Sequence, residues 1–135
     1  MASIRREITI DVPAAQVWSA MRDVGALHTR LAQGFVTDCR LDGAVRSVSF
    51  ANGLVVDEVI VTVDDEARRL VWSARSARLQ HHNASSQVLP EGGQACRVLW
   101  VADLLPDDMA PPITGMIEQG LRAMKSTLEG ASASS

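Results

Sequence analysis

In the middle of the chain, apolar and polar residues alternate in short runs separated by turn sequences. Between residues 35 and 105 the period is two, which is typical of half-buried β-strands. Asp42-Gly43 and Asn52-Gly53 favour tight hairpin turns. The pattern therefore predicts six consecutive antiparallel strands, at residues 35–41, 44–50, 54–63, 69–77, 82–89 and 95–105.

The N-terminal part combines one more strand with two short helices. Isoleucine and valine alternate with polar residues over residues 4–12 and predict a strand. Pro13 fits the first turn of a helix that ends near Gly25. A second helical segment is predicted for residues 26–32.

The C-terminal part has one apolar stripe with helical spacing, formed by Ile113, Met116, Ile117, Gly120, Leu121, Met124 and Leu128. Pro111 and Pro112 suit the first turn of this helix, and Gly130 suits its end. A helix of this length needs a large apolar partner, which the predicted sheet supplies. Residues 131–135 are small and polar and are predicted to be a disordered tail.

Composition narrows the class of protein. The 135 residues are 47% hydrophobic and 21% charged, which fits one soluble domain. A net charge of −3 argues against a broad nucleic-acid surface, and no apolar run is long enough for a membrane span. The first residues lack the apolar core of a secretory signal. We expect a cytoplasmic monomer or homodimer in which Cys39 and Cys96 are reduced thiols.

Motifs for metals, phosphates and nucleophiles are missing from the sequence. His81 and His82 are adjacent on a predicted strand, so their side chains point to opposite faces and cannot chelate one metal. Ser85 and Ser86 lack the G-x-S-x-G elbow of a hydrolase. The sequence therefore predicts neither a metal site nor a cofactor.

Several short motifs follow one another along nearly the whole chain, at residues 13–18, 43–46, 52–58, 64–68, 83 and 120–125. Through them the sequence resembles the START-like (SRPBCC) superfamily, in its polyketide cyclase/dehydrase-like branch. The resemblance implies an α+β helix-grip fold, formed by residues 1–130 as a single domain. In this fold a curved antiparallel sheet of about seven strands surrounds a long C-terminal helix, and two short helices follow the first strand. A ligand cavity between sheet and helix is implied as well.

This branch is also similar in fold to the plant abscisic acid receptors, from which the sequence departs. In the receptors, a lysine on the strand after the second helix binds the ligand carboxylate. This chain has Gln33, or a residue beside it, at the corresponding position. The only lysine here, Lys125, belongs to the terminal helix, and Ala84 replaces the receptors' tyrosine. Abscisic acid is therefore not the implied ligand, whereas some small apolar molecule is.

The resemblance places Arg46 and Glu58 inside the cavity on neighbouring strands. Strand alternation agrees, because Glu58 shares a face with Val56 and Ile60. A carboxylate on an apolar face is costly unless it is paired, so we expect an ion pair with Arg46. The pair is either a polar handle for a ligand or a structural pair that fixes strand register.

Further cavity residues follow from the same alignment and from alternation. The candidate ligand contacts besides Arg46 and Glu58 are Trp72, His82, Ala84, Ser86, Met116 and Gly120. The small side chains among them leave space for a ligand, unless larger neighbours such as Trp72 and Met116 fill it. Trp18 and Trp100 are expected to be packing residues, and the face that Trp100 occupies is left open.

Two classes of function remain in competition. The favoured one is a module that binds a small hydrophobic or amphipathic ligand, because no pair of side chains has compelling acid–base geometry. The alternative is a polyketide cyclase, aromatase or dehydratase, in which Arg46 and Glu58 orient a carbonyl and Glu58 or His82 moves protons. A protein-interaction role is a third interpretation, which the sequence does not support.

Overall fold

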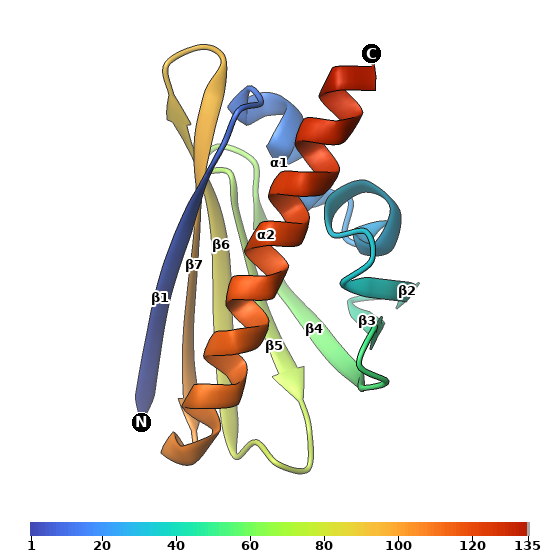
Figure 1. The fold of residues 1–135 in the computed structure, drawn as a ribbon. Helices are drawn as coiled ribbons and strands as arrows, with labels where there is room; N and C mark the ends of the chain where they lie inside the picture. Colours follow the sequence, from blue (N-terminus) through green and yellow to red (C-terminus); the bar gives the residue numbers. More distant parts are fainter. Residues whose placement is uncertain (135) are drawn as a thin grey trace.

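A curved seven-stranded antiparallel sheet wraps around a long C-terminal helix in the computed structural model, which describes residues 1–134 (Figure 1). The sheet order is β1-β7-β6-β5-β4-β3-β2. The strands are β1 (Ala2–Ile10), β2 (Val36–Asp42), β3 (Val45–Phe50), β4 (Val55–Asp64), β5 (Arg69–Arg75), β6 (His81–Glu91) and β7 (Ala95–Leu105). The helix-grip fold predicted from the sequence is thus confirmed.

The helices occupy the predicted places. Helix α1 (Ala14–Arg22) and the π-helix η1 (Leu27–Leu31) follow β1, and a 3₁₀ turn, η2 (Asp107–Met109), leads into α2 (Ala110–Ser134). Because α2 continues through Gly130, the predicted end of the helix at this glycine is wrong. Residues 131–134 of the predicted tail therefore belong to α2, and residue 135 lies outside the described residues. No helix within residues 1–134 is long and apolar enough to cross a membrane.

The β3–β4 hairpin sets the register of the strands that carry the charged candidates. Gly53 adopts a φ of +91°, a left-handed conformation that favours glycine, and Asn52 Oδ1 accepts a hydrogen bond of 3.0 Å from the Leu54 amide. The resulting antiparallel register places Arg46 directly opposite Glu58. Both side chains therefore emerge from one face of the sheet, as the alternation predicted.

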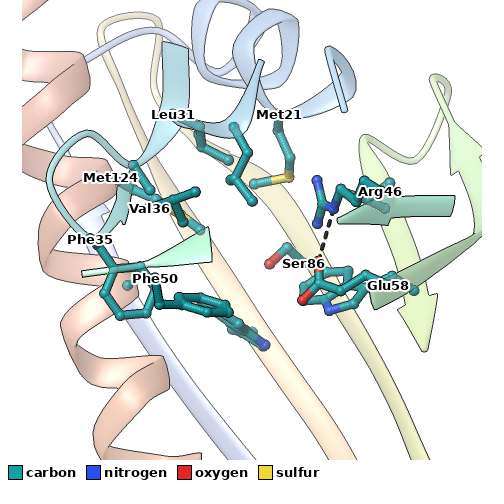
Figure 2. A pocket seen from close by; sticks show the side chains of 15 residues that line it. Met21, Leu31, Phe35, Val36, Arg46, Phe50, Glu58, Ser86 and Met124 are labelled. Atoms are coloured by element: carbon teal, nitrogen blue, oxygen red, sulfur yellow. Dashed lines mark hydrogen bonds and ion pairs between the residues drawn. The ribbon is translucent and has the colours of Figure 1, made fainter. Parts of the chain in front are cut away.

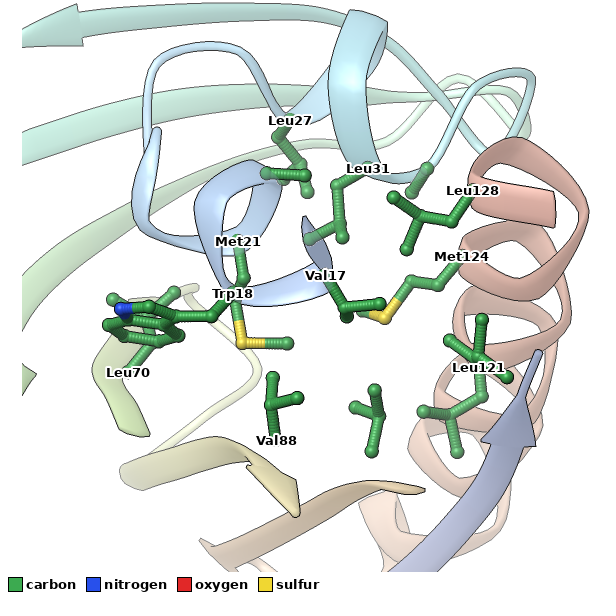
Figure 3. Close-up of a cluster of buried hydrophobic side chains, with 14 of the residues drawn as sticks. Val17, Trp18, Met21, Leu27, Leu31, Leu70, Val88, Leu121, Met124 and Leu128 are labelled. Atoms are coloured by element: carbon green, nitrogen blue, oxygen red, sulfur yellow. The ribbon is translucent and has the colours of Figure 1, made fainter. Parts of the chain in front are cut away.

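The dense part of the core lies toward one end of α2. Figure 3 shows the buried side chains of α1 and η1, including Val17, Met21 and Leu31, packed against the C-terminal half of α2. That half contributes Leu121 and Met124, which are almost fully buried. The N-terminal half of α2 lacks this covering layer of helices and faces the concave sheet directly (Figure 1). Space for a cavity is therefore expected beside the N-terminal half of α2, away from the dense core.

Candidate functional site

A cavity of about 260 Å³ lies between the N-terminal half of α2 and the concave face of the sheet. We call it the outer chamber. Met109, Ile113, Met116 and Ile117 line it from the helical side. The sheet, its loops and the segment before β2 contribute Phe35, Phe50, Leu54, Val55, Val56, Glu58, Trp72, Ala74, Ser76, Arg78, Leu79, His82 and Trp100. The walls are mostly apolar, as expected for a small-molecule site.

A second, smaller cavity of about 40 Å³ lies next to the outer chamber, toward α1 (Figure 2). This inner chamber is lined by Arg46, Glu58 and Ser86 together with apolar and aromatic residues, among them Met21, Leu31, Val36, Leu70 and Met124. Five residues line both chambers, namely Phe35, Phe50, Glu58, Trp72 and Trp100. The predicted cavity is therefore divided in two.

Two aromatic pairs form the boundary between the chambers. Phe35 and Phe50 meet edge to face with ring centroids 5.3 Å apart, and Trp72 and Trp100 do so at 5.5 Å. Trp100 thus faces inward and lines the cavity, so its expected role as simple packing is incomplete. Its register opposite Ser86 on β6 places both residues on the concave face, which alternation on β7 alone did not decide.

Gly120 is the point at which the helix approaches the aromatic boundary most closely. A Cβ atom at this position would lie 2.8 Å from Cζ3 of Trp100 and 3.2 Å from Cε2 of Phe35. The small residue therefore makes room for the two rings at the edge of the inner chamber, which Gly120 also lines. Ala84 is buried on β6 between Trp72 and Ala102 and lies outside the lining of both chambers. Of these two small candidates, Gly120 lines the inner chamber and Ala84 lines neither chamber.

Arg46 and Glu58 form the predicted ion pair. The Arg46 Nε donates a 2.8 Å hydrogen bond to Glu58 Oε1, and Nη1 donates to the Val24 carbonyl oxygen at 3.3 Å. The guanidinium carbon also lies 5.7 Å from the centroid of the Trp72 ring, a cation–π distance. The two side chains are only 4% and 11% exposed, so solvent screens their attraction little. No donor from the described residues hydrogen-bonds Glu58 Oε2.

His82 lines the outer chamber, but it is already hydrogen-bonded to two residues of β5. Its Nδ1 accepts a 2.9 Å hydrogen bond from the Ala74 amide, and its carbonyl oxygen accepts one of 2.6 Å from Ser73 Oγ. Burial, and to a lesser extent the charge of the neighbouring His81, lowers the pKa of His82 to about 4. At neutral pH the ring is therefore uncharged with its Nδ1 lone pair occupied, which disfavours a role in proton transfer.

The side chains that could bind a metal ion or react as thiols do not gather in one place within residues 1–134. Within residues 1–134, no three His, Cys, Asp or Glu side chains gather in a way that suits a metal ion. Cys39 on β2 and Cys96 on β7 are free and buried. Burial raises the pKa of Cys96 to about 11, so its thiol is protonated and unreactive at neutral pH.

Comparison with known families agrees with this architecture. A family model described as polyketide cyclase / dehydrase and lipid transport matches residues 1–129. The chain belongs to this family. None of the curated proteins matches it in sequence.

Three solved structures illustrate the fold of this polyketide cyclase / dehydrase and lipid transport family member. A START superfamily protein from Mycobacterium smegmatis is 11% identical over 98% of this chain and 97% of its own, with a TM-score of 0.73. Norcoclaurine synthase from Thalictrum flavum, a point mutant bound to a transition-state analogue, is 16% identical over 97% and 96%, with a TM-score of 0.72. The di-domain ARO/CYC BexL of the BE-7585A biosynthetic pathway is 17% identical over 96% of this chain and 47% of its own, with a TM-score of 0.78. At such identities the likeness concerns the fold.

We predict that Glu58→Ala lowers the free energy of unfolding by about 3–5 kcal/mol, because it leaves the buried Arg46 unpaired. Chemical denaturation at pH 7 measures this loss. Asp57→Ala is the matched control, since Asp57 is the exposed neighbour on the same strand and its loss should change stability little. Replacing both partners, as Arg46→Met with Glu58→Leu, should recover most of the stability. A Glu58→Ala variant as stable as the wild type would contradict the buried pair.

We also predict a stability change that depends on His82. Since its pKa falls from 6.5 to about 4 on folding, the unfolded chain binds a proton between these values that the folded chain does not. The contribution of His82 to the free energy of unfolding, up to about 3 kcal/mol, is complete above pH 6.5 and is lost as the pH falls toward 4. Denaturation curves of wild type, His82→Gln and the exposed control His81→Gln measure it. Only His82→Gln should flatten the pH dependence in this range, and equal curves for all three proteins would refute the assignment.

Proposed function

We propose that the protein binds one small hydrophobic or amphipathic molecule in the outer chamber. The observation that carries this proposal is the mostly apolar cavity of about 260 Å³, which has one buried carboxylate among its described lining residues, Glu58, at its inner boundary. This volume lies just below the roughly 300–1,000 Å³ of pockets that hold drug-sized ligands. The expected ligand is therefore small, with an apolar body and few polar groups.

The rim of the outer chamber supports a ligand as well. Leu54 and Val55, which follow the β3–β4 turn, line the chamber and are 44% and 65% exposed. Ile113 and Met116 of α2 are only partly buried, although they belong to the apolar stripe of the helix. A bound apolar molecule would cover these side chains and gain the free energy of burying their surface. The same surface stays in contact with water when the chamber is empty.

Catalysis is the second candidate function. Norcoclaurine synthase is an enzyme with this fold, and BexL is an aromatase/cyclase by name. The buried Arg46–Glu58 pair favours such a role, because it could orient a ligand carbonyl. Binding remains the leading proposal, since Glu58 is paired with Arg46 and His82 is neutral with its Nδ1 occupied.

A calorimetric titration with naphthalene tests the binding proposal. The wild type should bind one molecule saturably, and Gly120→Ala should abolish measurable binding because the new Cβ displaces Trp100. Gly115→Ala is the matched control on the same helix, since nothing lies within 4 Å of its added Cβ. Ala74→Leu, which fills the outer chamber from the sheet side, should also prevent naphthalene binding and replaces Gly120→Ala if that variant folds poorly. Equal binding by all four proteins, or none by the wild type, would contradict the proposal.

The catalytic candidate has its own test. Small molecules extracted from the host should be incubated with wild type and with Glu58→Gln, and the products compared by mass spectrometry. A product formed by the wild type and not by the variant would favour the cyclase-type function. If both proteins leave every molecule chemically unchanged and still bind naphthalene, the result favours the binding function.

A further inference from the structure

The inner chamber contains a buried hydroxyl group without a partner. Ser86 is 1% exposed and lines this chamber, and no described residue hydrogen-bonds its Oγ. The indole Nε1 of Trp100, a residue of the same boundary, is also buried and unpartnered among the described residues. Buried polar atoms are normally hydrogen-bonded, so such atoms beside an empty space call for a polar occupant. We propose that the inner chamber is a subsite for one neutral hydroxyl or carbonyl group of the ligand, an inference that rests on the proposed binding function.

The size of the inner chamber limits what can enter it. Its volume is about 40 Å³, whereas one water molecule requires roughly 10–15 Å³ by this measure. A hydroxyl, a carbonyl or a short polar substituent fits, but a ring does not. The ring system of the ligand therefore stays in the outer chamber, against the aromatic boundary, and only its polar end reaches Ser86.

The charge of the inner chamber decides which polar group is accepted. Among the described residues that line it, Arg46 and Glu58 are the charged ones, and each compensates the other across 2.8 Å. A ligand carboxylate would place a second anion beside one cation inside an apolar shell, which is unfavourable. A hydroxyl group instead can donate to Glu58 Oε2 and accept from Ser86 Oγ. The subsite therefore selects neutral oxygen groups over carboxylates.

Three probes that share one ring system test this selection at pH 7, namely naphthalene, 2-naphthol and 2-naphthoate. Calorimetry of the wild type should show 2-naphthol binding about tenfold more tightly than naphthalene, as one or two hydrogen bonds provide. It should show 2-naphthoate binding more weakly than either. Ser86→Ala should reduce the preference for 2-naphthol over naphthalene severalfold. Ser85→Ala is the matched control, because Ser85 precedes Ser86 on β6 and points to the other face of the sheet.

A charge variant tests the second half of the inference. Glu58→Gln leaves the Arg46 guanidinium uncompensated, so the order of affinities should invert and 2-naphthoate should bind more tightly than 2-naphthol. Naphthalene binding by the same variant verifies that the outer chamber is intact.

The outcomes separate the subsite from the function on which it rests. If naphthalene binds but 2-naphthol has no advantage, or keeps its advantage in Ser86→Ala, the subsite is refuted and the inner chamber holds ordered water only. The binding function then stands. If the wild type binds none of the three probes, both proposals fail.

Discussion

The buried ion pair between Arg46 and Glu58 is the constraint on which the rest of this site depends. Removing two charges from water is costly, and their attraction offsets that cost only when the geometry is good and the remaining donors are satisfied. Here the β3–β4 register supplies the geometry, while the Val24 carbonyl and the Trp72 ring satisfy the guanidinium. The pair introduces polar groups into a mostly apolar interior, and its two opposite charges add no net charge there. The hairpin register thus creates the pair, and the pair in turn sets the polarity of the cavity.

Helix α2 serves two purposes along one apolar stripe. Its C-terminal half, with Leu121 and Met124, packs with α1 and η1 into a dense core (Figure 3). Its N-terminal half, with Ile113 and Met116, covers the outer chamber. Gly120 lies at the junction, where a Cβ atom would collide with Trp100. A single small residue on the helix thus allows an indole ring to divide the interior into two chambers.

Much of this architecture is predictable from the sequence because it depends on local patterns. Period-two alternation and the Asn52-Gly53 turn fix the strands and the register, and the register in turn brings Arg46 opposite Glu58. The division of the cavity is not predictable in this way. It depends on how the Trp72 and Trp100 rings pack across strands, and on a helix crossing at Gly120 that no periodicity specifies. The hydrogen bond from the Ala74 amide to His82 was missed for a similar reason. The β5–β6 register ends at the Trp72–Ala84 pair, and beyond it the His82 side chain accepts a hydrogen bond from the β5 backbone in place of a strand neighbour.

The central claim, that a small molecule enters the space between sheet and α2, is tested most directly by NMR of methyl-labelled methionines. Met109 and Met116 line the outer chamber, Met21 and Met124 line the inner chamber, and Met1 lies on the surface. During a titration with 2-naphthol, the Met109 and Met116 methyl resonances should shift to saturation and show contacts to the ring protons. Met21 and Met124 should shift less, and Met1 should not move. Saturating shifts confined to Met1, or no shifts at all, would contradict the account.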